Sequence, residues 1–208
     1  MKLPKSAHYS QSWMIAEIAS DFELLDVWEL PVTGEADEFT TFLEGMLSFD
    51  PTAVESTPAR ALFWVRLRVG ELLGWDDAKK RPIPGCSETT LHDRLPDHLR
   101  HSADALAVGE ELKRAAGGFA PLYRTDREWA GEISNQTVHG VLHFGWVDQG
   151  AGRYRAHLAI YVKPRGTLGA LYMKLIEPFR HFVVYPALMR QIGRAWETRP
   201  REVTGQRG

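Results

Sequence analysis

Histidine and tyrosine side chains with even spacing occupy two neighbouring stretches in the second half of the chain. His139 and His143 lie in one stretch, and His157 and Tyr161 lie in the next. Because alternate residues of a strand point to the same side, the four side chains share one face of a predicted hairpin. Imidazole titrates near neutral pH, so this face could transfer protons. A solvated face or a dimer contact is the favoured alternative, because antiparallel sheets commonly expose one face to water.

The register of this hairpin follows from keeping polar and apolar side chains apart. Pairing position 147 with position 153 places His143 opposite His157 and His139 opposite Tyr161. His139 and His143 are then about 13 Å apart along one strand, whereas zinc ligands lie about 2 Å from their ion. His143 and His157 could share an ion, but no third ligand adjoins them. We therefore expect no metal site.

A second group of chemically active side chains lies near the C-terminus. Arg180, His181 and Tyr185 follow Glu177 at helical spacing, within side-chain reach. If Arg180 or Tyr185 faced the sheet, it would supply the polar anchor that orients a ligand in an apolar cavity. The alternative is a surface ion pair with Glu177, which contributes little to stability.

Common enzyme signatures are missing from the sequence. There is no glycine-rich phosphate loop, nucleophile elbow or paired metal motif, and we expect no cofactor. The single cysteine, Cys86, excludes an intrachain disulfide and is predicted to be a surface-loop thiol.

Composition is typical of one soluble globular domain. The chain has 208 residues, of which 44% are hydrophobic and 25% charged. We expect a single domain over residues 1–198 and a flexible tail over 199–208. The first ten residues do not form a signal peptide, and the apolar stretch Leu168–Met189 is interrupted by charges, so a cytoplasmic location without membrane insertion is expected.

Charge is distributed unevenly along the chain. From Ala151 onward there are 11 Lys and Arg but 3 Asp and Glu. The basic residues are spread among apolar positions, so we expect oppositely charged parts of one domain to face each other and expect no nucleic-acid partner.

Apolar periodicity and turn residues predict an α+β order of elements. The predicted elements are a strand within Trp13–Leu30, helices over Asp37–Leu47 and from Thr57 to about Gly74, a surface excursion over Lys79–Arg100, strands over Phe119–Thr125, Glu128–Ser134, Thr137–Val147 and Arg153–Lys163, and a helix over Thr167–Trp196. Pro178 and Pro186 should kink the last helix.

This order of elements resembles the START-like (SRPBCC, polyketide cyclase-like) superfamily. The strings at Asp26–Pro31, Ser134–His139, Leu142–His143, Tyr161–Gly166, Pro178–His181 and Val184–Pro186 resemble the bacterial domain of unknown function 2867 family. The resemblance implies a helix-grip fold, in which a curved antiparallel sheet surrounds a long kinked C-terminal helix and two short helices follow the first strand. It also implies an apolar cavity between sheet and helix, and it transfers no catalytic role to any residue.

The ligand cavity is expected where the apolar side chains of the sheet and of the last helix meet. They are Leu142, Phe144, Trp146, Tyr154, Leu158, Tyr172, Phe179 and Phe182. The first hypothesis is a protein that binds a small apolar or amphipathic molecule there. The second is a cyclase, dehydratase or hydrolase that uses His, Tyr, Glu or Arg side chains as acid and base. The third is an interaction module, for instance a homodimer, that has no ligand.

Overall fold

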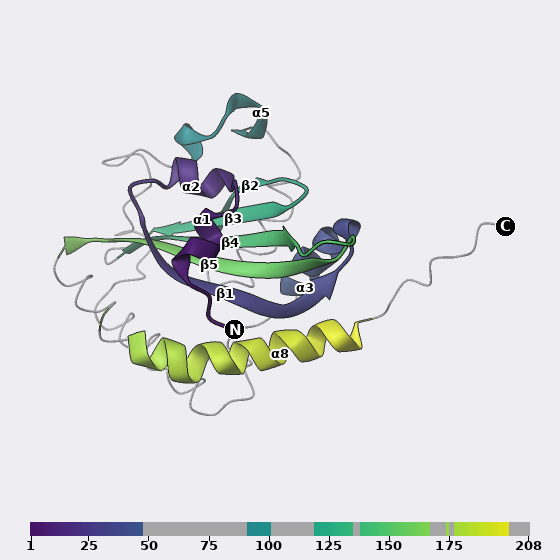
Figure 1. The fold of residues 1–208 in the computed structure, drawn as a ribbon. Helices are drawn as coiled ribbons and strands as arrows, with labels where there is room; N and C mark the ends of the chain where they lie inside the picture. Colours follow the sequence, from purple (N-terminus) through teal and green to yellow (C-terminus); the bar gives the residue numbers. More distant parts are fainter. Residues whose placement is uncertain (48–90, 101–118, 135–137, 167–173, 175–176, 200–208) are drawn as a thin grey trace.

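Five antiparallel strands form one open sheet in the order β1-β5-β4-β3-β2 (Figure 1). The computed structural model describes residues 1–47, 91–100, 119–134, 138–166, 174 and 177–199. The strands are β1 (Glu23–Gly34), β2 (Ala120–Arg124), β3 (Glu128–Ser134), β4 (Val138–Asp148) and β5 (Tyr154–Pro164). The predicted bounds of β2 to β5 are confirmed to within one residue. The architecture is α+β, as expected.

The register of the β4–β5 hairpin differs from the prediction by two residues. Val147 pairs with Arg155, so His143 lies opposite Ala159 and His157 lies opposite Gly145. The turn between the strands is longer than assumed, because residues 150–152 all have positive φ angles and Gln149 N–H donates to the carbonyl of Arg153. The predicted faces are nevertheless correct, since a slip of two residues preserves the side to which each side chain points.

The strand predicted within Trp13–Leu30 is present but begins only at Glu23, and a helix takes the place of its first part. Helix α1 (Lys5–Tyr9) and helix α2 (Met14–Ile18) precede β1, which extends past Pro31 to Gly34. Pro31 is tolerated because β1 is an edge strand and its pairing with β5 is irregular between Glu29 and Thr33. The predicted helix after β1 is confirmed as the short helix η1 (Ala36–Glu38) followed by α3 (Phe39–Leu47).

Apolar side chains are buried on both faces of the sheet. One cluster lies beneath α1, α2 and the short helix η3 (Leu91–Arg94), which is followed by α5 (Asp97–Arg100). Leu91 and Leu95 are almost completely buried in it, so the predicted surface excursion is wrong at these positions. The predicted helix from Thr57 and the thiol of Cys86 lie outside the described residues.

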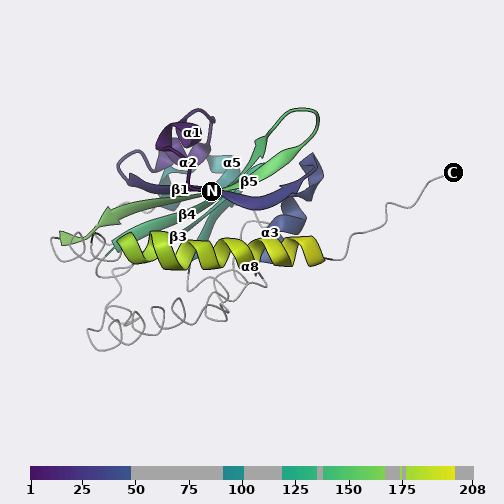
Figure 2. The same ribbon diagram turned by 60° about the horizontal axis from the view of Figure 1, so that its bottom comes forward.

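The second cluster lies between the other face of the sheet, α3 and the C-terminal helix. This helix is described over residues 177–198 and consists of a π-helical turn, η4 (Arg180–Val184), and the α-helix α8 (Tyr185–Thr198). Pro186 has no N–H to donate to the preceding turn, which accounts for the irregular turn between the two prolines. Figures 1 and 2 show α8 beside β1, on the far side of the sheet from α1 and α2.

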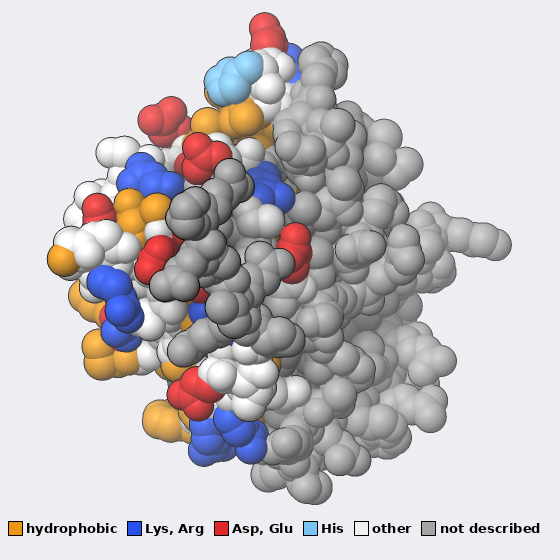
Figure 3. Space-filling model, turned by 90° about the vertical axis from the view of Figure 1, so that its right-hand side faces the viewer, with side chains coloured by type: hydrophobic (Ala, Val, Ile, Leu, Met, Phe, Trp, Pro, Cys, Tyr) orange, Lys and Arg blue, Asp and Glu red, His pale blue; other side chains and the backbone are white. Residues whose placement is uncertain are grey.

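Cations of the C-terminal third pair with acidic residues from earlier in the chain, as expected. The pairs are Arg155–Glu29, Lys163–Asp21, Arg180–Asp26 and Arg199–Glu38. Acidic and basic side chains are accordingly mixed on the described part of the surface in Figure 3.

Arg199 was predicted to begin a flexible tail, yet it is anchored. It donates hydrogen bonds to Glu38 and to the carbonyl of Trp196, and its guanidinium lies 3.3 Å from the centre of the Trp196 ring. Residues 200–208 lie outside the described part of the chain. No described helix has both the length and the apolar character needed to cross a membrane.

Candidate functional site

The predicted polar face of the hairpin is buried rather than solvated. The side chains of His139, His143, His157 and Tyr161 lie on this face, and each of these residues is at most 6% exposed. Helices α1 and α2 cover the face, as Figure 1 shows. No helix was predicted before β1 from the sequence, so this cover was not anticipated. The alternative of a solvated or dimer-forming face is therefore wrong for these residues.

His143 forms a buried pair with Glu128, which the sequence had not indicated. Glu128 lies opposite Gly145 in the β3–β4 ladder, so His143 is its diagonal neighbour on the same face. Oε2 of Glu128 is 3.0 Å from Nε2 of His143 and accepts a 2.8 Å hydrogen bond from the hydroxyl of Tyr123. Oε1 accepts the backbone N–H of Met14 at 3.1 Å, which ties α2 to the sheet.

These contacts keep Glu128 in its carboxylate form. Burial by itself would raise the pKa of Glu128, but the hydrogen bond and charge of His143 outweigh burial, with help from Met14 and Tyr123, and the pKa is lowered. Burial and the adjacent carboxylate raise the pKa of the Tyr123 hydroxyl, which stays protonated as a donor.

His8 of α1 extends the buried network to β5. Its Nε2 is 2.7 Å from the Tyr161 hydroxyl, and its ring centre is 5.3 Å from that of His143. Burial, followed by electrostatic interactions with His143 and His157, lowers the pKa of His8 to about 3. Burial raises the pKa of Tyr161. His8 is thus neutral and Tyr161 is protonated near neutral pH.

The remaining histidines of this face have other surroundings. Nε2 of His139 is 2.9 Å from Glu132, a pair that repeats the His143–Glu128 geometry four residues along the ladder. Burial lowers the pKa of His157 to about 4, although Glu29 acts in the opposite direction. The described residues contain no group of three His, Cys, Asp or Glu side chains placed to hold a metal ion.

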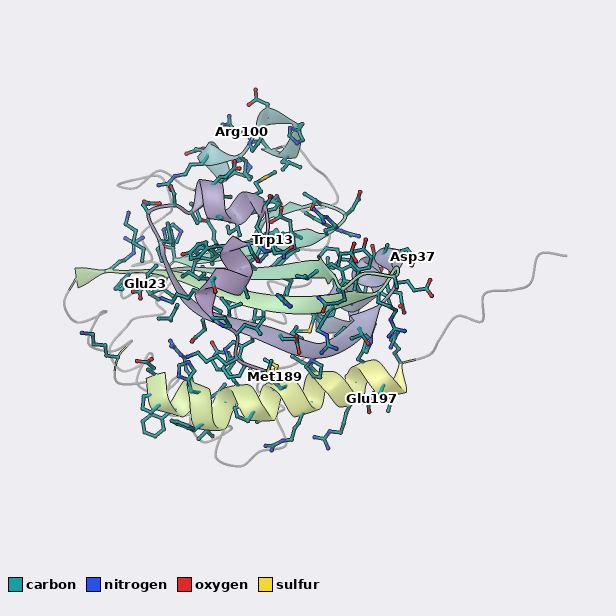
Figure 4. The ribbon with its side chains drawn as sticks, in the orientation of Figure 1. Trp13, Glu23, Asp37, Arg100, Met189 and Glu197 are labelled. Carbon is teal, nitrogen blue, oxygen red and sulfur yellow. The ribbon has the colours of Figure 1, made fainter. Side chains whose placement is uncertain are left out.

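A groove of about 680 Å³ reaches this network from the surface. Glu128 lines it together with residues of α2, of the loops before and after α2, and of the segment around η3: Ser12, Met14, Glu17, Ile18, Ser20, Asp21, Arg94 and Pro96. Arg94 of η3 donates hydrogen bonds to Asp21 and to the carbonyl of Ile18. These bonds join the η3 side of the groove to the side formed by α2 and the loop after it. Figure 4 shows Trp13, whose ring centre is 5.3 Å from that of His143, where α2 meets the sheet.

The second predicted group meets a partner on β1 instead of Glu177. Asp26 is 1% exposed; its Oδ1 is 2.6 Å from Nε2 of His181, and its Oδ2 is 3.0 Å from Nη2 of Arg180. Tyr185 donates its hydroxyl to Oδ2 at 3.3 Å, and burial followed by the Asp26 charge raises the pKa of Tyr185. The alternative of a surface ion pair with Glu177 is therefore wrong.

Five residues of the predicted cavity lie together in the cluster beneath α3 and α8: Leu142, Phe144, Trp146, Tyr154 and Leu158. Phe179 and Phe182 were expected to join them, but they are 48% and 81% exposed. The π-helical turn lengthens the repeat ahead of α8, so the apolar band that continues through Tyr185 does not include Phe182. Tyr172 lies outside the described residues.

Sequence reasoning missed four residues of the two polar groups described above. His8, Tyr123 and Glu128 belong to the buried network around His143, and Asp26 is the partner of Arg180, His181 and Tyr185. One available signal was the matching interval of four between the acids at 128 and 132 and between the histidines at 139 and 143, on adjacent predicted strands. His8 and Asp26 depend on contacts distant in sequence, which no local pattern indicates.

A family model described as "Protein of unknown function (DUF2867)" matches residues 18–187. No curated protein and no solved structure matches the chain.

Proposed function

The chain belongs to the DUF2867 family of proteins of unknown function, and from this premise we propose that it binds a small amphipathic molecule. The groove between α2, η3 and β3 is the proposed site, and Glu128 is the group that holds the polar end of the ligand. The observation that carries the proposal is an ionised, almost buried carboxylate at an open groove of ligand size.

Glu128 retains the capacity to bind a donor. Its Oε2 accepts two hydrogen bonds, whereas its Oε1 accepts, among the described residues, the N–H of Met14 alone. A carboxylate oxygen can accept two hydrogen bonds, so a hydroxyl or amine of the ligand could donate the second hydrogen bond to Oε1. Met14, Ile18 and Pro96 provide apolar contacts beside it. The proposed ligand is therefore a molecule with a hydrogen-bond donor at one end and an apolar body.

The helix-grip, START-like assignment is part of this proposal. It is supported by the antiparallel order of the open sheet and by the C-terminal helix packed against one of its faces. The proposal retains the predicted ligand class but moves the site to the opposite face from the predicted cavity.

A ligand screen tests the proposal. Amphipathic amines, alcohols and phenols are added to the full chain in thermal melts, and a hit is titrated by calorimetry. At a hundred times its dissociation constant, a ligand should stabilise the fold by about 2.7 kcal/mol. Glu128→Gln should weaken the hit by roughly tenfold or more, because a hydrogen bond to a charged group contributes about 1.5–3 kcal/mol.

Two further variants make this test specific. Asp37→Asn makes a comparable change of charge at an exposed residue of η1, far from Trp13 in Figure 4, and should leave affinity unchanged. Ser12→Phe fills the groove from an exposed position without altering the network and should also weaken binding. Equal affinity in Glu128→Gln, Ser12→Phe and the unaltered protein would exclude this groove.

Acid–base catalysis is the second candidate, and the Glu128–His143 pair with its Tyr123 donor favours it. Such a pair can exchange a proton with a bound molecule. Chromatography of a hit after incubation would distinguish the two, since a catalyst would consume it and Glu128→Gln would not. A screen without hits, together with a dimer in solution, would instead favour the interaction module.

A further inference from the structure

The groove at Glu128 is lined by more acidic than basic side chains. Among the described residues that line it, Glu17, Asp21 and Glu128 are acids and Arg94 is the one base. Arg94 donates hydrogen bonds to both carboxylate oxygens of Asp21, and Nζ of Lys163 lies 3.3 Å from the same side chain. The charge of Asp21 is therefore compensated, and Arg94 is not available to the other two acids.

Glu17 and Glu128 keep negative charge at the groove. Glu17 is exposed on α2, and no cation of the described residues pairs with it. Glu128 contacts His143 and Tyr123 through Oε2, whereas its Oε1 can accept a second hydrogen bond beside that of Met14. The lowered pKa of Glu128 keeps this carboxylate ionised near neutral pH. A ligand in the groove thus meets one enclosed and one exposed carboxylate.

A protonated amine matches this lining better than a neutral hydroxyl group does. An ammonium group has three donors and no acceptor, and the hydroxyls of Ser12 and Ser20 in the groove lining can accept hydrogen bonds in addition to the carboxylates. Hydrogen bonds between ionised partners are roughly twice as strong as those between neutral partners. A carboxylate ligand would instead be repelled by Glu17 and Glu128.

We propose that the ligand of this groove is a cation, namely a primary amine with an apolar body. The ammonium group donates a hydrogen bond to Oε1 of Glu128 and is attracted by the exposed carboxylate of Glu17. The apolar body contacts Met14, Ile18 and Pro96, which line the same groove. This inference rests on the proposed function, to which it adds the charge of the ligand.

Calorimetric titration of the full chain with three ligands of equal chain length tests the charge. The ligands are octylamine, 1-octanol and octanoate, and near neutral pH the first is a cation and the last an anion. Octylamine should bind roughly tenfold or more tightly than 1-octanol, because its hydrogen bond to Glu128 joins two ionised groups. Octanoate should bind more weakly than 1-octanol, because the groove repels its charge.

Glu17→Gln tests the attraction of the ligand without altering the buried network. This variant should bind octylamine about two- to fivefold more weakly, as expected for the loss of an exposed ion pair, and should bind 1-octanol as before. Glu44→Gln is the matched control, because Glu44 is an exposed acid of α3, which packs on the opposite face of the sheet. It should bind octylamine as the unaltered protein does.

The outcomes separate this inference from the proposed function. Equal affinity for octylamine and 1-octanol would overturn the cationic ligand but leave the groove as a binding site. Equal affinity for octylamine in Glu17→Gln and Glu44→Gln, or tighter binding of octanoate than of octylamine, would overturn it in the same way. Undetectable binding of octylamine would overturn this inference by itself, and the lack of any hit in the wider screen would overturn the proposed function as well.

Discussion

The buried histidines should make the fold sensitive to acid. Each unfolded histidine titrates near 6.5, whereas the pKa is about 3 for folded His8 and about 4 for folded His157. The folded state therefore binds fewer protons than the unfolded state below pH 6.5. Their contribution to stability is complete above that pH and is lost as pH falls towards the folded pKa values. Protonation of Glu128, whose pKa is lowered from 4.5, acts in the same direction at lower pH.

The size of the effect follows from the number of protons. One proton bound on unfolding changes the free energy of unfolding by about 1.4 kcal/mol per pH unit. With two histidines, the slope between about pH 6 and pH 4 approaches about 2.7 kcal/mol per unit. Small domains are typically stable by about 5–15 kcal/mol, so this slope should bring the protein close to unfolding near pH 4.

Urea unfolding at intervals from pH 7 to pH 4.5 measures the slope. His8→Gln keeps a polar side chain near Tyr161 but cannot titrate, so its slope should be smaller by about 1.4 kcal/mol per unit. His98→Gln removes an exposed histidine of α5 and should follow the unaltered protein. Parallel curves for His8→Gln and the unaltered protein, or stability that rises in acid, would refute the explanation.

The sheet was predictable because its signals are local. Strands β3, β4 and β5 alternate apolar and polar residues, and the short connections between them, of which the β4–β5 connection contains two glycines, require antiparallel neighbours. The register of β4 and β5 was not predictable at the same level. Pairing 147 with 153 or with 155 places the same side chains on the same faces, and the backbone angles of residues 150–152 decide between them.

The candidate sites were predictable only in part because each combines distant segments. The pattern correctly grouped His143 and Tyr161 on one face, but their partners are Glu128 of β3 and His8 of α1. A strand face that carries several histidines is expected to be exposed to solvent, unless another part of the chain packs on it. The cover comes from residues 1–22, whose short helices have no strong periodicity of their own.

Two further predictions concern stability at these sites. A methyl group at Gly145 would lie 2.8 Å from the buried ring of Trp13, so Gly145→Ala should destabilise the fold by about 1–3 kcal/mol, whereas Gly140→Ala, where the nearest atom is 3.5 Å away, should have a much smaller effect in urea unfolding. Equal losses would mean that the ring can move. Asp26→Ala should cost about 3–5 kcal/mol, because it leaves cations enclosed without their counter-ion. Glu29→Ala should cost about 1 kcal/mol or less, because the pair of Glu29 with Arg155 is partly exposed and screened by solvent. Since both acids are on β1 and each pairs with an arginine, equal losses would show that burial does not set the strength of the Asp26 cluster.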